Sequence, residues 1–112
     1  MLEEVQVKRD MTSEPDDLFP VLITRRLKMQ RSPSDALIDV VVEIGTPYWT
    51  EPDVEAACPV AIRGTVGRVN DIRGIDPMSA MKQAISFVEA YLDHPVGDEK
   101  FFWSDGEGYS DE

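Results

Sequence analysis

The sequence has few of the residues from which catalytic and metal-binding sites are built. Its 112 residues include one cysteine, Cys58, and one histidine, His94. A single cysteine excludes an internal disulfide and a zinc site made of several cysteines of one chain. We expect Cys58 to be a buried, inert thiol, because it lies in an apolar stretch. His94 lies at the end of a predicted helix, where the helix dipole favours a cation, and this is a sufficient structural reason for its presence. We therefore predict a non-enzymatic protein without a metal or cofactor.

The sequence also lacks a net positive charge and long apolar runs. Lysine and arginine number 11 against 22 acidic residues, for a net charge of −11. This balance argues against binding to nucleic acids and to anionic membranes, because both need a basic surface. No apolar run approaches the length of a membrane span, and the first residues lack a secretory signal. These absences predict a cytoplasmic protein.

The acidic residues are concentrated at the two ends of the chain. Residues 1–20 hold six acids and two bases, residues 21–92 hold nine and eight, and residues 93–112 hold seven and one. We predict a largely flexible N-terminal arm over 1–20, one domain over 21–103 and a flexible acidic tail over 104–112. Acidic surface speeds encounter with a basic protein, which we predict as a partner. The alternative is that the acidic ends only keep a small protein in solution.

Two stretches of alternating apolar residues predict a β-hairpin. The first begins at Val21, with Arg25 as a polar interruption, and the second runs from Ala36 to Ile44. Between them, residues 31–35 supply turn chemistry around Pro33. The two apolar faces coincide if the numbers of paired residues sum to an odd number, as a tight turn near Pro33 requires.

The next part of the chain predicts shorter elements. Prolines 47 and 52 interrupt residues 45–55, which we expect to form a loop of about ten residues. A third strand is predicted over residues 57–63 and a short fourth strand over 68–73.

A helix is predicted from Asp76, a suitable N-terminal cap, to Leu92. Its apolar face is expected to consist of Met78, Met81, Ile85, Val88 and Leu92. Alanines and aromatic residues extend this face to about half of the circumference, more than one sheet face covers. Either the aromatic residues 101–103, which are suited to a short final strand, or a second chain must pack there. The pattern predicts an α+β fold: a meander of about four antiparallel strands with one long C-terminal helix packed on one face. It also predicts a homodimer.

Five residues form the candidate binding site of the sequence. Aromatic and arginine side chains are the usual anchors of protein interfaces, and the chain places such residues in the predicted loop and around the third and fourth strands: Tyr48, Trp49, Arg63, Arg68 and Arg73. The alternatives are that the two aromatic residues pack back on the domain and that the arginines form a solvated charged rim.

Residues 21–103 resemble a small bacterial domain family of unknown function. The resemblance rests on short motifs: Thr24-Arg25-Arg26-Leu27, Ile44-Gly45-x-Pro47, Cys58-Pro59-x-x-Ile62-x-Gly64, Gly74-x-Asp76-x-Met78-x-Ala80-Met81-x-x-Ala84, and Trp103. It covers about three-quarters of the chain and implies an α+β domain. It implies no activity and no site residues.

The sequence thus favours a non-catalytic protein-interaction domain, of which an immunity or antitoxin-like protein that covers a basic toxin is one specific form. The alternative is a small anionic-ligand-binding or enzymatic domain that uses Tyr48, Trp49 and the nearby arginines. A third hypothesis is a purely structural subunit of a larger assembly.

Overall fold

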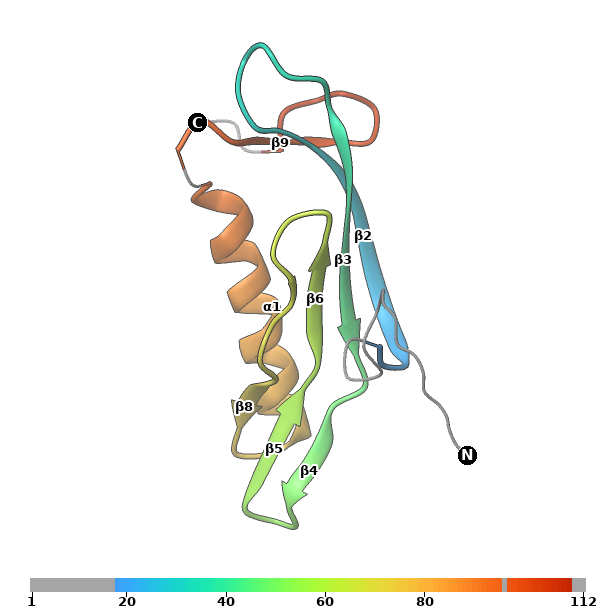
Figure 1. The fold of residues 1–112 in the computed structure, drawn as a ribbon. Helices are drawn as coiled ribbons and strands as arrows, with labels where there is room; N and C mark the ends of the chain where they lie inside the picture. The colour runs from blue at the N-terminus through green and yellow to red at the C-terminus, as the bar shows by residue number, and fades with distance from the viewer. Residues whose placement is uncertain (1–17, 96, 110–112) are drawn as a thin grey trace, which may run out of the picture.

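The computed structural model describes residues 18–95 and 97–109 and confirms the predicted α+β class. In this part of the chain one helix packs against antiparallel strands (Figure 1). The elements are β2 (Val21–Gln30), β3 (Ile38–Gly45), β4 (Tyr48–Glu51), β5 (Glu55–Cys58), β6 (Val60–Arg63), β7 (Gly67–Arg68), β8 (Ile72–Gly74), α1 (Pro77–Asp93) and β9 (Lys100–Trp103). They form a five-stranded sheet in the order β7-β6-β3-β2-β9 and a three-stranded sheet in the order β4-β5-β8.

The predicted hairpin is confirmed as β2 and β3. From Ile23↔Ile44 to Met29↔Ile38, the numbers of paired residues sum to 67, the odd value that the shared apolar face requires. Leu27 and Met29 of β2 are buried. They face the buried residues of β3: Val40, Val42 and Ile44. The pairing is irregular between Val21 and Ile23, where the strand approaches its N-terminal end.

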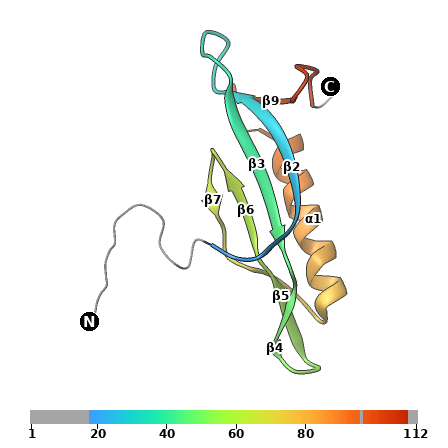
Figure 2. The same cartoon turned by 90° about the vertical axis from the view of Figure 1, so that its right-hand side faces the viewer.

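The prediction of a loop over residues 45–55 was wrong, because most of this segment pairs as the β4–β5 hairpin. Pro47 and Pro59 lie at the junctions between strands of the two sheets. β3 leads into β4 past Pro47, and β5 leads into β6 past Pro59. The amide of Gly45 donates a hydrogen bond of 2.9 Å to the carbonyl of Pro59 and so joins these two connections. Two sheets therefore replace the single meander, and the β4–β5 hairpin projects beyond the other strands (Figure 2).

The predicted helix is confirmed as α1. The Asp76 carboxylate accepts a hydrogen bond of 2.7 Å from the amide of Ser79 and so caps the first turn. The predicted apolar face was wrong in its first half, since 82% of Met78 is exposed and Ile85 is exposed as well. The buried stripe is instead Ala80, Ala84, Val88 and Leu92.

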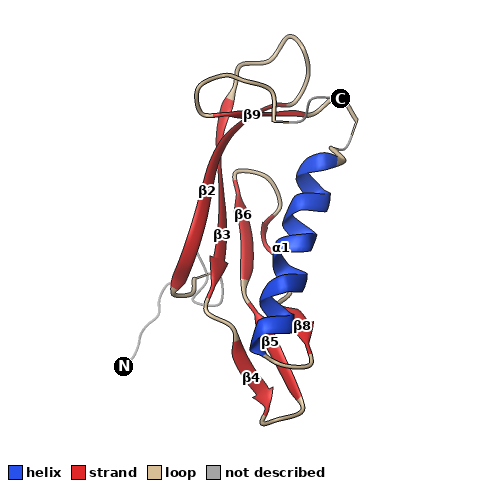
Figure 3. Cartoon of the chain, turned by 180° about the vertical axis from the view of Figure 1, so that it is seen from behind, coloured by secondary structure: helices blue, strands red, loops and turns tan. Residues whose placement is uncertain are grey.

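A close approach between β8 and α1 explains this rotation. A Cβ atom added at Gly74 would lie 2.4 Å from the backbone nitrogen of Ala80. The first turns of the helix therefore lie close to β8 and β5 (Figure 3), and the small residues Ala80 and Ala84 are the buried ones there. The larger residues Met78 and Ile85 lie beside this buried stripe and are exposed.

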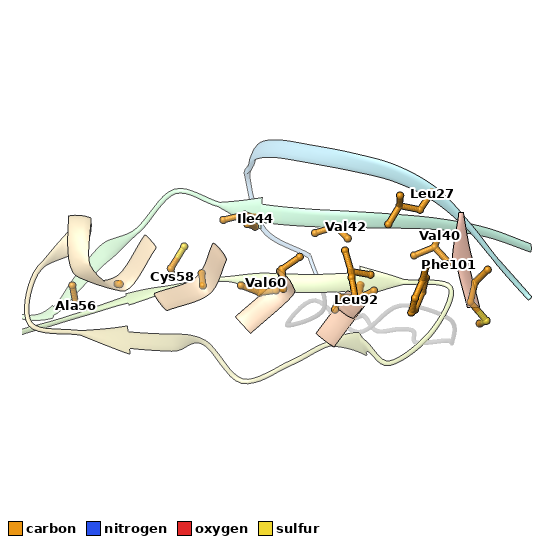
Figure 4. Close-up of a cluster of buried hydrophobic side chains, with 14 residues drawn as sticks. Leu27, Val40, Val42, Ile44, Ala56, Cys58, Val60, Leu92 and Phe101 are labelled. Carbon is orange, nitrogen blue, oxygen red and sulfur yellow. The ribbon is translucent and has the colours of Figure 1, made fainter. Parts of the chain in front are cut away.

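The core lies between the two sheets and α1 and extends to β9 (Figure 4). Phe101 of β9 is buried, and its ring lies 5.9 Å from that of Tyr91 on the helix. The aromatic segment thus forms the short final strand that its sequence indicates. Residues 104–109, within the expected tail, fold back on β9, where the amide of Tyr109 donates to the carbonyl of Phe101 at 2.9 Å.

The two acidic ends lie largely outside the described residues. Most of the predicted arm, residues 1–17, and the end of the predicted tail, residues 110–112, are not described. In the described part, no helix has the length and apolarity to cross a membrane.

Candidate binding surfaces

Three of the predicted site residues line one groove on the outer face of the sheets. Tyr48, Arg68 and Arg73 border an open groove of about 830 Å³. Phe19 and Asp71 line it as well, so that a ring and a carboxylate share the groove with the arginines. The place of Phe19 in this groove was not predicted from the sequence, because Phe19 lies in the segment that was expected to be a flexible arm.

Trp49 lies on the opposite face of β4. Tyr48 pairs with Ala57 and Trp49 with Ala56, and directly paired residues share a face of the sheet. Ala57 pairs in turn with Arg73, whereas Ala56 pairs with Gly74, which approaches the helix. Trp49 is therefore on the helix side of the small sheet, and the two aromatic residues do not act together.

Arg63 lies on the outer face beside the groove. The guanidinium carbons of Arg63 and Arg68 lie 5.8 and 4.8 Å from the centre of the Phe19 ring. The ring also packs against Gly45, where an added Cβ atom would lie 2.6 Å from it. Phe19 is thus held between two cations and a close backbone.

Each of these arginines contacts a carboxylate. The ion pairs are Arg63–Glu43 at 3.0 Å, Arg68–Asp71 at 2.5 Å and Arg73–Glu55 at 2.9 Å. The Tyr48 hydroxyl donates to the Asp71 carboxylate, and this bond, followed by desolvation, raises the pKa of Tyr48. An anionic ligand in this groove would have to compete with the carboxylate of Asp71.

Cys58 and His94, the single cysteine and histidine of the sequence, both have contacts that belong to the fold. Cys58 is buried, its thiol lies 3.4 Å from the carbonyl oxygen of Gly45, and burial raises its pKa to about 11. The thiolate form that reacts is therefore suppressed. His94 ends α1 and donates its amide to the carbonyl of Ala90. Within residues 18–95 and 97–109, no three His, Cys, Asp or Glu side chains are grouped to hold a metal ion.

A second candidate surface lies where β2 extends beyond its pairing with β9. β9 pairs with residues Leu27–Gln30, so that the N-terminal half of β2, residues 21–26, has β3 on one side and no strand of the described chain on the other (Figure 2). We call this segment the β2 edge. Val21, Leu22 and Ile23 are each about half exposed along it.

The backbone of the β2 edge has polar groups that point away from β3. The Arg26 carbonyl accepts a hydrogen bond of 3.2 Å from the hydroxyl of Ser104, on the β9 side. Because successive residues of an antiparallel strand direct their N–H and C=O groups to alternate sides, the backbone groups of Thr24 point to the same side. There they face the open edge.

An apolar groove accompanies this edge. It encloses about 140 Å³ between β2, β3 and α1 and is lined by apolar residues with a few polar ones: Ile23, Thr24, Arg25, Val42, Ile44, Ile85, Val88 and Glu89. Ile85 also borders a shallower surface over Met78 and Met81. The exposed apolar side of α1 and the β2 edge are therefore continuous through Ile85.

Arg25 closes one end of the groove. Its guanidinium donates to the Tyr109 hydroxyl at 2.6 Å and lies 5.4 Å from the centre of the Trp103 ring. The interruption that Arg25 makes in the apolar pattern of β2 thus anchors the C-terminal turn. In the sequence, the only indication of the β2 edge and its groove was that the predicted helix has more apolar residues than one sheet face covers.

Comparison of the chain with protein-family models, curated proteins and solved structures found no match. The family resemblance inferred from its short motifs therefore stays a prediction.

Proposed function

We propose that this chain is a non-catalytic protein-interaction domain that binds an extended polypeptide segment along the β2 edge. The observation that carries the proposal is the open strand edge directly beside an apolar groove. Each feature alone is common on protein surfaces. Together they supply the two parts of strand addition, in which backbone hydrogen bonds give affinity and pockets for alternate side chains give specificity.

The backbone part of the site is centred on Thr24. Its N–H and C=O groups are directed toward the open side of the sheet, as the hydrogen bond between Arg26 and Ser104 indicates. Unpaired strand edges readily take up another strand, and proteins usually protect them. β9 gives this protection to Leu27–Gln30 but not to the preceding half of β2.

The apolar part of the site consists of Ile23, Ile85 and the groove between them. An added strand would direct every second side chain toward α1, where these two residues are 45% and 37% exposed. Burial of one aliphatic side chain stabilises a complex by about 1.5–3 kcal/mol. We therefore expect a bound segment with apolar residues at alternate positions.

The charge distribution supports a basic protein as the source of that segment. The chain has a net charge of −11, and its acids are concentrated outside residues 21–92. Such a field accelerates encounter with a basic partner and contributes less to affinity after docking. An immunity or antitoxin-like role is one specific form of this proposal.

The groove of Tyr48, Arg68 and Arg73 supports a second candidate, the binding of a small anionic ligand. The observation in its favour is that three predicted residues meet there. The observation against it is that Asp71 contacts both Tyr48 and Arg68. We rank it below strand addition, because the ligand would have to displace or neutralise that carboxylate.

Selection from a random-peptide display library on the immobilised full chain tests the proposal. We expect enriched peptides with alternating apolar residues, whose binding is lost in Ile23→Asp and retained in Leu37→Asp. Leu37 is a matched control, because it is similarly exposed but lies beyond the other end of the hairpin. Peptides that bind both variants equally would contradict the proposal.

A further inference from the structure

We infer that the polypeptide segment bound along the β2 edge ends there, and that Arg25 binds its C-terminal carboxylate. This inference rests on the proposed function and names the part of the partner that the edge accepts. One observation behind it is a cation in the groove that has no carboxylate partner in the described part of the chain. The other is that the edge is closed beside this cation.

Arg25 is the cation of the groove. It lies on the same face of β2 as Ile23 and lines the groove with it. A guanidinium has five N–H donors, and in the described chain that of Arg25 forms one hydrogen bond, from Nη1 to the Tyr109 hydroxyl at 2.6 Å. Within residues 18–95 and 97–109, Arg25 forms no ion pair, whereas four other arginines each contact a carboxylate: Arg31, Arg63, Arg68 and Arg73.

The contacts of Arg25 hold its charge in place without neutralising it. The guanidinium carbon lies 5.4 Å from the centre of the Trp103 ring and 5.7 Å from that of the Tyr109 ring. Aromatic faces attract a cation but carry no net charge. The side chain is also half-buried, and an ion pair is stronger where water is partly excluded. A carboxylate that reaches this guanidinium therefore finds a preorganised partner.

The β2 edge is closed at the same place. β9 pairs with β2 from Leu27 onward, and the Arg26 carbonyl accepts a hydrogen bond of 3.2 Å from the Ser104 hydroxyl. A strand added along residues 21–25 therefore meets the end of β9 beside Arg25 (Figure 2). It must stop there or leave the plane of the sheet. A chain that stops there brings its terminal charge to the guanidinium.

The charge of Arg25 determines the direction of the segment. β2 runs from Val21 to Gln30, so that a chain whose C-terminal end lies at Arg25 is parallel to β2. The opposite direction would bring an N-terminal ammonium to the same guanidinium, and the two cations would repel each other. Parallel pairing is slightly weaker per residue than antiparallel pairing. The charge-assisted hydrogen bonds to the carboxylate offset this difference.

Glu89, on the α1 wall of the groove, is the charge that opposes a bound carboxylate. Its side chain is exposed, and exposed charges interact weakly through water, whereas Arg25 is half-buried. Arg25 therefore dominates the closed end of the groove. A basic partner satisfies this contact as well, because every polypeptide has a C-terminal carboxylate while its basic residues lie elsewhere and provide the long-range attraction.

Two forms of one peptide test the inference by calorimetry on the full wild-type chain. The peptide is selected from a display library that presents free C-terminal ends, and it is synthesised with a C-terminal carboxylate and with a C-terminal amide. We expect the carboxylate form to bind at least about tenfold more tightly, because hydrogen bonds between charged groups belong to the stronger class. Equal affinities of the two forms would overturn the inference.

Arg25→Gln identifies the residue that binds the carboxylate. This variant should lose the preference for the carboxylate form and bind both forms as the wild type binds the amide. Arg26→Gln is the matched control, because it removes the same charge from the next residue, whose exposed side chain lies on the other face of β2. A preference that persists in Arg25→Gln, or that is lost equally in Arg26→Gln, would contradict the role of Arg25.

Ile23→Asp separates failure of this inference from failure of the proposed function. If both forms bind the wild type equally and neither binds Ile23→Asp, carboxylate binding is overturned and strand addition is retained. If both forms bind Ile23→Asp as tightly as the wild type, strand addition is overturned, and the inference that rests on it is overturned as well.

Discussion

Substitution of Gly74 by alanine tests the close packing of α1 on β8. A Cβ atom at this position would lie 2.4 Å from the nitrogen of Ala80, 2.7 Å from the carbonyl carbon of Ser79 and 2.8 Å from the Cα of Ala80. All three are backbone atoms of the first helical turn, so that no side chain can rotate away. The helix must move outward by about 1 Å to restore normal contact distances.

That movement forfeits packing along the buried stripe of α1. A gap of 0.5–1 Å loses about a quarter to a half of the dispersion energy of the contacts across it. Overpacking of a core typically costs about 1–3 kcal/mol, and we expect the upper end, about 3 kcal/mol, because the clash involves backbone. For a domain of this size, this loss lowers Tm by roughly 12–24 °C.

Gly67→Ala is the matched control, because Gly67 has a φ of +72° but no atom within 4 Å of an added Cβ. It should cost about 1–2 kcal/mol through backbone strain alone. Urea unfolding followed by circular dichroism measures both variants. A Gly74→Ala variant that loses less than 1 kcal/mol, or no more than Gly67→Ala, would refute the packing argument.

Three further predictions follow from particular contacts. The pKa of Cys58 is about 11 in the folded chain against about 9 in the unfolded chain, so its stabilising contribution is present below pH 9 and is lost as the pH rises to 11. The free energy of unfolding should therefore fall more between pH 9 and 11 in the wild type than in Cys58→Ala. Equal slopes of the two variants would contradict burial of the thiol. Tyr109→Phe should lower stability by about 0.5–1.5 kcal/mol in urea unfolding, because it removes the bond from Arg25, and an unchanged midpoint would argue against that anchor. Asp71→Asn should bind inorganic phosphate more tightly than the wild type by calorimetry, because the competing carboxylate is removed, and equal affinities would remove the anion-binding alternative.

Local periodicity was sufficient to predict the best-defined elements. The alternation in β2 and β3 and the turn at Pro33 determine their register, and Asp76 followed by Pro77 determines the start of α1. These features depend on neighbours in the sequence, for which propensity and pattern are informative.

The rotation of α1 could not be predicted, because it depends on contact between distant segments. Gly74 lacks a side chain and lets the helix approach, which selects the alanine stripe instead of the stripe of Met78 and Ile85. The strand junctions at Pro47 and Pro59 have the same origin, since both prolines lie where two paired strands change sheets together.

The candidate site was predicted in part. The sequence indicated Tyr48, Arg68 and Arg73, which the structure brings into one groove, but adjacent residues of a strand face opposite sides, and this separates Trp49 from them. The β2 edge depends on where β9 stops pairing with β2. Strand order is a property of the whole fold, and periodicity does not contain it.

Amide hydrogen exchange at Thr24 in the full chain, alone and with a saturating peptide obtained from the display selection, tests the central claim most directly. We predict rapid exchange in the free chain, where the edge is open, and at least tenfold slower exchange when the peptide is paired with it. An exchange rate that is the same with and without the peptide would contradict the claim that this edge binds an extended polypeptide segment.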